Sequence, residues 1–353
     1  KPHVVLGTYE QGIQDVYRVH FNDGTSTECT LDHVWQVSSS YDRSLGKHRV
    51  MSLSQIMQEG FRHDCGTAKW GVPLSEPVEY IKGEELPLDP YLFGLLLGDG
   101  SFRVGNRGSI TLSSAVEDIE YLQEELVGCV PEGVETALRT RPGTSSASSV
   151  GYGEFRFRNI GAKQGPTHPN PMKGIVKDLG LLDIIGEDKF IPEVYLRSSI
   201  EERTALLQGL VDSDGCVSET AVRFVSGSRA LAEGVCELVG SLGGVASLKK
   251  TKNRKTYQVT IRKRFPEGII PARFPRKVAK YVCKRDMPRV RSMVGAEYSR
   301  SVETKCIKVS ADDGLYITEN FIVTHNTPRM ALMVSGGTLT PEAVQSIEDF
   351  FKA

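Results

Sequence analysis

Hydrophobic and polar residues alternate in short runs at both ends of this 353-residue chain and form longer apolar blocks in its middle. Residues 16–21 alternate apolar and polar side chains, and the Asn-Asp-Gly sequence after them is typical of a turn. Residues 34–37 predict a further strand, residues 38–47 a polar loop and residues 53–61 a short helix. The first part of the chain is therefore expected to be rich in β-structure.

An apolar block begins after Asp89, whose short polar side chain suits a helix N-cap, and ends at Gly100. Its interior is apolar almost all round, which predicts a buried helix. Gly94 and Gly98 are four residues apart and share one helix face, where another backbone can approach closely. Residues 64–88, which precede this helix, contain several glycines and prolines and predict a linker.

A second block, residues 207–215, repeats the features of the first. Ser199 and Glu202 ahead of it have the spacing of a capping box, and small residues again stand four apart. Asp214 precedes a glycine as Asp99 does in the first block. Strand-like residues and another helix follow each block, so the chain contains an internal duplication in which each copy is helix, strands and helix.

Two helices packed through small residues would bring Asp99 and Asp214 together at one end of their interface. Two carboxylates held close can bind a divalent metal, with Mg²⁺ favoured, which activates water and stabilises a phosphate leaving group. The alternative for one copy is a simple Asp-Gly turn at a helix end. Two copies in matching contexts favour the metal site.

Positive charge is concentrated although the net charge of the chain is only −1. Residues 249–291 contain 16 Lys or Arg and two acids, and further arginines fall on or beside the strands of the first copy. Such strands can enter a major groove while the surrounding charge binds phosphates, and the alternative is a solvated face. The candidate DNA-binding residues are Arg103, Arg107, Arg139, Arg141, Arg156, Arg158, Lys249, Lys250, Lys252, Arg254, Lys255, Gln258 and Arg262.

Composition excludes several classes of protein. An apolar content of 39% with 25% charged residues fits a soluble globular protein, and no apolar run approaches the length of a membrane span. The chain opens with no signal peptide, and its seven cysteines include no CxxC pair. A disulfide framework and a zinc knuckle are therefore not indicated, and a reducing, cytoplasmic location is expected.

Near the end, an apolar run stops at His325-Asn326-Thr327. An asparagine can cleave its own backbone when its side-chain nitrogen attacks its carbonyl and closes a succinimide, and a neighbouring histidine can supply the proton for the leaving amine. Thr327 would then carry a hydroxyl able to accept an acyl group. Taken alone, the motif is weak, and a strand end followed by a turn is the better interpretation.

With these motifs the chain resembles, over about residues 1–326, an intein that carries a LAGLIDADG (DOD-type) homing endonuclease. The resemblance implies an α+β fold. An all-β Hint (hedgehog–intein) domain would be interrupted by a pseudo-twofold α/β endonuclease of two helix-strand-strand-helix repeats. The implied parts are the first Hint segment at 1–75, a linker at 76–88, the endonuclease at 89–291 with repeats at about 89–180 and 198–291, the second Hint segment at 292–326 and the start of a C-extein at 327–353.

The resemblance also implies roles for residues of the endonuclease part. The paired blocks resemble the two family motifs, which makes Asp99 and Asp214 the metal-binding catalytic carboxylates. Lys189, in the sequence Lys-Phe-Ile-Pro, resembles the family's catalytic lysine, and its alternative is an ordinary surface residue before a helix. Lys277 is a weaker candidate for the counterpart of Lys189.

The splicing part resembles the family at both ends. Residues 30–33 resemble the TxxH motif, and the set of Trp35, Cys306 and Thr324 resembles class 3 inteins, which lack an N-terminal nucleophile. Cys306 would then be the first nucleophile and Thr327 the second, whereas the alternative for Cys306 is a buried structural cysteine. The splicing residues implied are Thr30, His33, Trp35, Cys306, Thr324, His325, Asn326 and Thr327.

Because TxxH comes early, the upstream junction is expected to be missing, through truncation or because the chain is half of a split system; truncation is favoured. The function expected is self-cleavage at Asn326 without a cofactor and Mg²⁺-dependent cleavage of double-stranded DNA at a long site in an intein-less allele. The protein would be a monomer in a bacterial or phage-infected cell, with no membrane partner. Its host extein faintly resembles a phage portal protein. The alternatives are a DNA-binding module without nuclease activity and an inert insertion in a phage structural protein.

Overall fold

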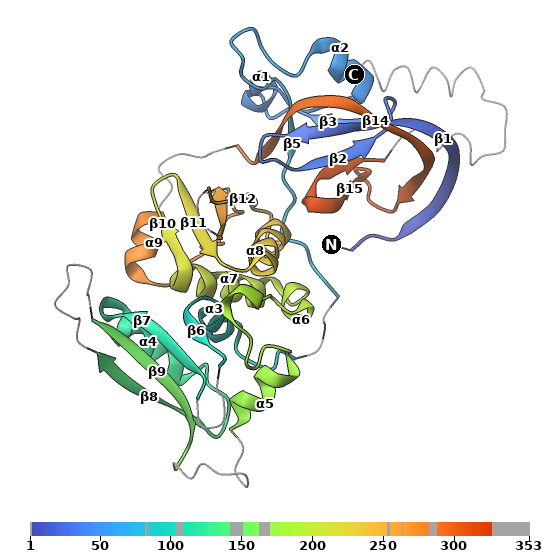
Figure 1. Ribbon diagram of the computed structural model, residues 1–353. Helices are drawn as coiled ribbons and strands as arrows, with labels where there is room; N and C mark the ends of the chain where they lie inside the picture. Colours follow the sequence, from blue (N-terminus) through green and yellow to red (C-terminus); the bar gives the residue numbers. More distant parts are fainter. Residues whose placement is uncertain are drawn as a thin grey trace. The chain divides into compact units, whose positions relative to one another are not determined.

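The structure is a computed structural model. It describes residues 2–81, 83, 85–103, 109–141, 151–161, 170–252, 255–262, 264–281 and 288–326. The chain divides into two compact units (Figure 1). Unit 1 comprises Lys1–Ser75 and Pro288–Ala353, and unit 2 comprises Glu76–Met287. Among the described residues, no helix has both the length and the apolar character needed to cross a membrane.

Unit 1 is built mainly from antiparallel strands. Its four-stranded sheet has the order β2-β1-β14-β5, and its strands are β1 (Val5–Phe21), β2 (Ser26–Cys29), β5 (Gly71–Pro73) and β14 (Val290–Val309). Two further antiparallel pairs consist of β3 (Val34–Val37) with β4 (Arg49–Ser52), and β15 (Leu315–Ile317) with β16 (Val323–His325). The short 3₁₀ helix η3 (Glu319–Phe321) lies between β15 and β16. The prediction of strands at residues 16–21 and 34–37 is confirmed.

The buried residues of β1 depart from strict alternation. Val16, Val19 and Phe21 are all buried, and the register with β14 shifts between Val16 and Tyr17. The extra residue at this shift is Ser299 on β14, and such a bulge disturbs the ladder and increases the local twist of the two strands. With Trp35 and other buried side chains, this end of β1 forms the core of unit 1.

Two short helices in unit 1 begin at capping boxes. α2 (Leu53–Glu59) is capped by Ser52 and ends before Gly60, so the prediction of a helix here is confirmed. The prediction of a loop over residues 38–47 is wrong, because α1 (Ser40–Ser44) begins there. Ser39 caps α1 reciprocally with Asp42, and an ion pair to that carboxylate adds to the cap.

Two predicted boundaries are wrong in part. The proposed linker at residues 64–88 includes the buried Trp70 and the strand β5, which pairs with β14. Its glycines and prolines therefore serve an edge strand as well as a connection. The boundary placed at residue 291 falls inside β14, because this strand continues from Val290 without a break.

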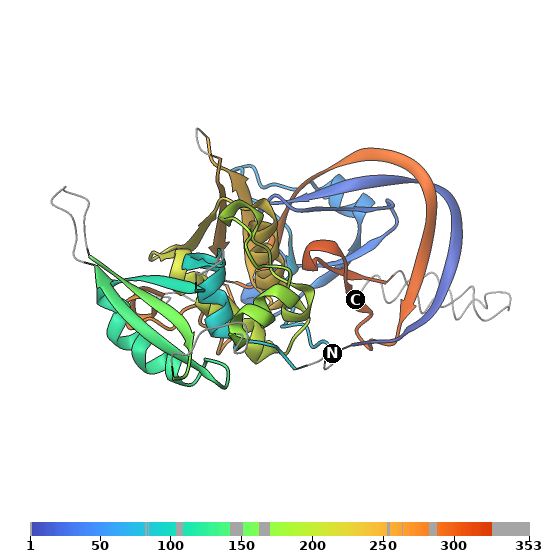
Figure 2. The same cartoon turned by 60° about the horizontal axis from the view of Figure 1, so that its bottom comes forward.

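Unit 2 is organised around two adjacent helices, α3 (Pro90–Asp99) and α7 (Ile200–Asp214), which lie between two sheets (Figures 1 and 2). As predicted, Asp89 caps α3 through the backbone N–H of Leu92, and Ser199 with Glu202 forms a capping box on α7. Both helices are largely buried.

Glycines allow α3 and α7 to touch backbone to backbone. A Cβ on Gly94 would lie 2.3 Å from the carbonyl oxygen of Leu206, and a Cβ on Gly209 would lie 2.2 Å from that of Tyr91. No side chain fits at these distances. The prediction of close approach through small residues is confirmed.

Each of the two helices is followed by the same succession of elements. The two sheets have matching strand orders, β6-β7-β9-β8 and β10-β11-β13-β12. The first half of unit 2 (residues 89–180) contains, after α3, β6 (Gly100–Ser101), β7 (Thr111–Ala115), the 3₁₀ helix η1 (Val116–Asp118), α4 (Ile119–Val127), β8 (Val134–Arg141), β9 (Tyr152–Asn159) and α5 (Pro171–Asp178). The second half (residues 198–281) contains, after α7, β10 (Gly215–Val217), β11 (Ala221–Ser226), α8 (Arg229–Ser241), β12 (Val245–Lys250), β13 (Tyr257–Arg262) and α9 (Pro275–Tyr281). Between the halves lie η2 (Gly186–Asp188) and α6 (Glu193–Leu196).

Candidate active sites

Asp99 and Asp214 are the last residues of α3 and α7, and each is followed by a glycine in an extended conformation. A Cβ on Gly100 would lie 2.3 Å from the carbonyl oxygen of Leu96, and Gly215 is confined in the same way. Glycine is therefore required sterically after the aspartate at both helix ends. This places two carboxylates at the same end of the α3–α7 pair.

The two carboxylates influence each other electrostatically. Burial, followed by the charge of Asp99, raises the pKa of Asp214 to about 6, while Lys189 and Lys277 oppose this rise. Burial also raises the pKa of Asp99, again against the effect of both lysines. Although both side chains reach solvent, the protein around them removes enough water to weaken these acids. The site thus combines two carboxylates with two ammonium groups.

Lys189 caps the end of α3. Its side chain is buried, and its Nζ donates to the carbonyl oxygens of Leu96, Leu97, Gly98 and Gly100 at 2.8–3.1 Å. The carbonyl of Leu96 also accepts from the backbone N–H of Gly100, and the carbonyls at this end carry the negative end of the helix dipole. Burial lowers the pKa of Lys189 to about 8. The alternative of an ordinary surface residue is excluded.

Lys277 occupies the matching position at the end of α7. Its Nζ donates to the carbonyl oxygens of Val211, Asp212 and Gly215 at 2.7, 2.6 and 2.8 Å. Burial lowers its pKa as well. Each helix that ends in a candidate carboxylate is therefore capped by its own buried lysine.

Sequence reasoning missed another carboxylate on α7, which is buried. Asp212 is 2% exposed, and its Oδ2 accepts hydrogen bonds from the hydroxyl of Tyr91 and from the backbone N–H groups of Arg273 and Phe274. Burial raises its pKa to about 6. The corresponding residue of α3 is Leu97, so an acid in an otherwise apolar helix was the available indication.

Cavities lie on both sides of the helix ends. One, of about 530 Å³, is lined by Lys189 and Asp214, and a smaller one of about 60 Å³ is lined by Asp99, Asp118 and Arg276. Asp118 and Arg276 were also missed from sequence, because nothing in the local pattern distinguishes them from other charged residues. The cavity beside Asp214 is therefore much larger than the cavity beside Asp99.

The donor set fits a metal that takes only part of its ligands from protein. Within the part of the chain that the structure describes, no cluster of three or more His, Cys, Asp or Glu could hold an ion. Mg²⁺ commonly binds through one or two carboxylates and completes its shell with water and substrate phosphates. Asp99 and Asp214 suit that pattern, and a cation between them would relieve the repulsion that raises the pKa of Asp214.

Several predicted DNA-binding residues lie on the sheet faces opposite the core. Arg156 and Arg158 on β9 alternate with the buried Phe155 and Phe157, and their guanidinium groups pair with Glu154 and Glu135. These ion pairs reduce the positive charge that the two arginines present. On β13, Gln258 and Arg262 likewise alternate with buried Val259 and Ile261.

The remaining predicted basic residues differ in what the structure describes of them. The exposed ones are Arg103, Arg139, Lys249, Lys250, Lys252 and Lys255. Arg107 and Arg254 lie outside the described residues, and Arg141 is described only as the last residue of β8. The exposed residues that are described belong to both halves of unit 2.

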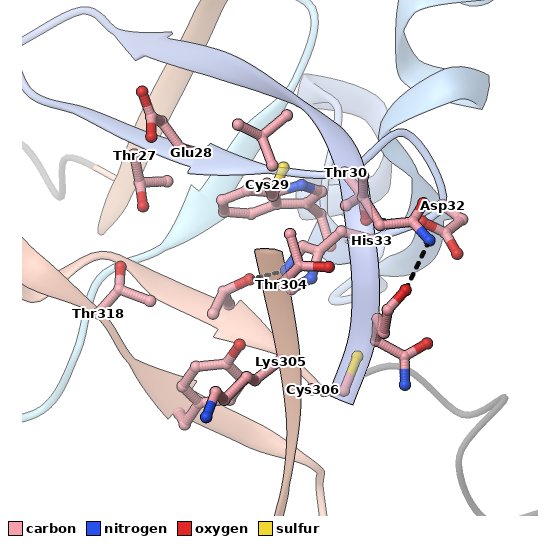
Figure 3. A pocket seen from close by; sticks show the side chains of 16 residues that line it. Thr27, Glu28, Cys29, Thr30, Asp32, His33, Thr304, Lys305, Cys306 and Thr318 are labelled. Atoms are coloured by element: carbon pink, nitrogen blue, oxygen red, sulfur yellow. Dashed lines mark hydrogen bonds between the residues drawn. The ribbon is translucent and has the colours of Figure 1, made fainter. Parts of the chain in front are cut away.

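Unit 1 contains a cavity of about 240 Å³ that gathers most of the predicted splicing residues (Figure 3). Its lining includes Thr30, His33, Trp35, Cys306 and Thr324, which come from widely separated parts of the sequence. The TxxH segment and the Trp, Cys and Thr set therefore share one cavity.

His33 is the polar centre of this cavity. Its Nε2 lies 2.5 Å from the hydroxyl oxygen of Thr324, and its ring meets that of Trp35 edge to face at 5.3 Å. Burial lowers the pKa of His33 to about 4, with a smaller lowering effect of His325 and an opposing one of Asp32. The imidazole is therefore neutral at pH 7.

The two cysteines of the cavity differ. Burial raises the pKa of the Cys29 thiol to about 12, so it stays protonated and unreactive at neutral pH. Cys306 lies on β14 opposite Tyr9 and is partly exposed. Cys29 was not among the predicted residues.

Thr30 of the TxxH segment has a polar partner close by in the sequence. Its hydroxyl donates to Asp32 at 2.6 Å.

At the end of β16, the side chain of His325 contacts the backbone of Asn326. His325 is buried, and its Nδ1 lies 2.6 Å from the backbone carbonyl oxygen of Asn326. Because a carbonyl can only accept, this ring nitrogen donates. The N–H of Asn326 donates to the carbonyl of Gly314 at 2.8 Å. Thr327 lies outside the described residues.

Gly314 fits closely against this pair. Its φ is +64°, and a Cβ there would lie 2.9 Å from Oδ1 of Asn326 and 3.0 Å from Cε1 of His325. Both the backbone conformation and the spacing favour glycine. Gly314 thus contacts both residues of the His-Asn motif.

Comparison with known proteins gives one family match. Residues 201–265 match the model of the LAGLIDADG-like domain. The replicative DNA helicase DnaB of Mycobacterium intracellulare is 24% identical over 335 residues, which cover 88% of this chain and 50% of that protein. The chain thus spans about half the length of this curated relative.

Solved structures of a homing endonuclease show limited similarity. Mesophilic variants of homing endonuclease I-DmoI give a TM-score of 0.33 at 16% identity, covering 56% of this chain and 93% of that chain. The crystal structure of I-DmoI in complex with DNA and Mn gives 0.33 at 18% identity, covering 50% and 90%. The family match is the stronger finding, and the matched segment carries Asp214 and the second sheet.

Proposed function

We propose that unit 2 is a LAGLIDADG-type homing endonuclease that cleaves double-stranded DNA with the help of Mg²⁺, and that its two halves are related by a pseudo-twofold axis. The observation that carries the proposal is the pair of buried lysines, one at each helix end that bears a carboxylate. Two strands of a duplex require two reaction centres, and the duplicated helix ends supply matching groups for both.

Asp99 and Asp214 would hold the metal. When bound, Mg²⁺ would supply activation of water and stabilisation of the charge on the leaving phosphate oxygen. Lys189 and Lys277 keep positive charge beside the carboxylates, which favours a scissile phosphate there. The basic and polar residues on the sheets would contact the DNA backbone and the groove, because such side chains bind phosphates and base edges.

The test is cleavage of a plasmid that contains the host gene with the coding region of the whole insertion removed, from its upstream junction through Asn326. The wild-type chain with Mg²⁺ is expected to convert the supercoiled plasmid to a linear product. Asp99→Asn or Asp214→Asn should abolish that conversion, whereas Asp178→Asn, an exposed acid on α5, should leave it unchanged. Full activity in both helix-end variants would refute the assignment, and DNA binding without cleavage by the wild type would favour the module without nuclease activity.

We propose further that unit 1 is an intein Hint domain that cleaves the chain after Asn326. The contact between His325 Nδ1 and the Asn326 carbonyl favours this function. The side-chain nitrogen of Asn326 would attack its own carbonyl carbon, which the histidine N–H polarises. The bond to Thr327 breaks and a succinimide forms. The attacking nitrogen loses one proton, and the nitrogen of Thr327 gains one as it leaves as an amine.

Within the cavity, we propose that Cys306 is the nucleophile of the upstream step, as in class 3 inteins, with His33, Trp35 and Thr324 beside it. Thr327 would be the later acyl acceptor. Mass spectrometry should detect the fragment that begins at Thr327, and Asn326→Ala should prevent its release. Release from Asn326→Ala at the wild-type rate would sink the assignment, and a wild type that releases nothing would favour an inert insertion.

The host protein is open to a direct test. The match to the DnaB helicase spans 335 residues, far more than the 27 that follow Asn326 (353 − 326), so residues 1–326 carry most of it. A shared inserted element would produce such a match. The coding sequence upstream of residue 1 will show whether the host is a helicase or a phage portal protein, which residues 327–353 faintly resemble. A monomeric, cytoplasmic protein remains our proposal.

A further inference from the structure

The contacts that hold Lys277 in place cross from one half of unit 2 to the other. Arg276, its neighbour on α9, donates from Nε and Nη2 to the two carboxylate oxygens of Asp118 at 2.8 and 2.5 Å. Asp118 ends η1 in the first half and is 5% exposed. Bidentate pairs of this kind fix orientation as well as distance.

Other contacts between the halves surround this pair. The ring of Phe274 meets the ring of Tyr121 on α4 edge to face at 5.6 Å. Arg273 reaches Glu125 of the same helix at 3.2 Å. The segment that leads to Lys277 is therefore docked against η1 and α4 of the first half.

The anchoring of Lys189 differs in kind. Its backbone carbonyl accepts a hydrogen bond of 2.5 Å from the hydroxyl of Ser228, the N-cap of α8 in the second half. An uncharged backbone contact thus secures Lys189, whereas Lys277 depends on a charged pair one residue away. The two capping lysines can therefore be disturbed separately.

We propose that Asp118 and Arg276 are positioning residues for Lys277, and that they set the efficiency with which one of the two DNA strands is cut. The inference rests on the proposed endonuclease function. α9 has seven residues, too few to hold a helix without side contacts. Loss of the pair would let α9 move, release Lys277 from the carbonyls at the end of α7 and leave the Lys189 side intact.

Asp118→Asn has a matched control in Glu117→Gln. The carboxylate of Glu117 lies 3.1 Å from Nε of the same Arg276, but its side chain is 64% exposed. Both variants remove one negative charge at adjacent positions near the proposed DNA site, so both alter long-range attraction to DNA alike. Exposed pairs contribute little, and only the buried pair should affect Lys277.

The first measurement needs no DNA. The full-length chain is treated with a limiting amount of an amine-reactive acetylating reagent, and the modification of Lys277 and Lys189 is quantified by peptide mass spectrometry. Asp118→Asn should speed acetylation of Lys277 by about tenfold or more, because free amines react and capped ones are protected. Lys189 in the same sample, and both lysines in Glu117→Gln, should be unchanged. Equal acceleration at both lysines, or none at Lys277, would overturn the proposal.

The second measurement resolves the two strands of a cognate duplex labelled at different ends. With saturating DNA and Mg²⁺, Asp118→Asn should slow cleavage of one strand by about tenfold while the other changes by less than about twofold. Equal slowing of both strands would mean a general loss of structure and would refute the positioning role.

Failure of the endonuclease function and failure of the positioning role give different results. If the wild type cuts no DNA, the proposed endonuclease function fails, and the acetylation of Lys277 still decides whether the pair positions it. If Asp118→Asn does not fold, Arg276→Lys is used, because it keeps the charge and loses the bidentate geometry. Selective exposure of Lys277 in that variant supports the proposal, and unchanged protection contradicts it.

Discussion

A buried base in unit 1 and a buried acid in unit 2 have pKa values that shift in opposite directions. In unit 1, burial lowers the pKa of the base His33 to about 4, whereas in unit 2 it raises the pKa of the acid Asp212 to about 6. The cause is shared, because loss of water disfavours the charged form of either group. The consequences differ: unit 1 presents a neutral imidazole, and unit 2 contains a carboxyl group that is a weaker acid than usual.

The units also differ in how they fix their reactive residues. In unit 2, the packing of α3 against α7 and the glycines after Asp99 and Asp214 determine where the carboxylates lie. In unit 1, a strand end and the turn at Gly314 hold Asn326. The first arrangement belongs to a helix interface, and the second to a local loop. The two proposed activities should therefore respond independently to mutation.

The largest expected effect separates the two activities. Asp214→Asn should reduce DNA cleavage by about a thousandfold and leave release at Asn326 within about twofold, and Asn326→Ala should do the reverse. Each purified variant is tested both for DNA cleavage and for release of the fragment that begins at Thr327. Loss of both activities in either single variant would show that the units are not independent.

A smaller effect is expected at the turn of unit 1. Gly314→Ala should slow release of the C-terminal fragment by about tenfold, because its Cβ would displace Asn326 and His325 from their close contact. Gly24→Ala is the control, since Gly24 also has a positive φ but its added Cβ would meet open space, with no neighbouring atom within 4 Å. Time courses of release measure both. Equal slowing in both variants would assign the effect to backbone strain alone.

The stability of unit 1 should fall in acid. The pKa of His33 is lowered in the folded state from 6.5 to about 4. The contribution of His33 to the free energy of unfolding is therefore present above pH 6.5 and is lost as the pH falls through 4. His33→Gln should remove this loss, which amounts to up to about 3 kcal/mol. Denaturant unfolding of unit 1, followed by the fluorescence of its two tryptophans between pH 4 and 8, measures the change. An unaltered pH profile would contradict a buried neutral histidine.

The stability of unit 2 should fall as the pH rises, because of Asp212. The pKa of Asp212 is raised in the folded state from 3.8 to about 6, so its contribution is present below pH 3.8 and is lost as pH rises through 6. Asp212→Asn keeps an acceptor for Tyr91 and should stabilise unit 2 at pH 8 by about 2 kcal/mol. Calorimetry at pH 4 and pH 8 provides the measurement, and a stabilisation equal at both values would rule out this cause.

Much of the fold followed from local sequence patterns. The caps at Asp89 and Ser199 and the glycine spacing in both apolar blocks predicted α3 and α7 and their close contact. The helix α1 and the edge strand β5 were missed, because a reciprocal cap after a polar run and a pairing with the distant β14 leave little periodicity to detect.

Local patterns were enough to predict which residue types could carry the chemistry, since paired Asp-Gly helix ends and the His-Asn motif are local. The tertiary structure decided which residues assist them. Lys277 meets Val211, and Asp118 meets Arg276, across separations that no local pattern encodes. Burial, which sets the pKa values of Asp212 and His33, also arises only when distant segments pack together.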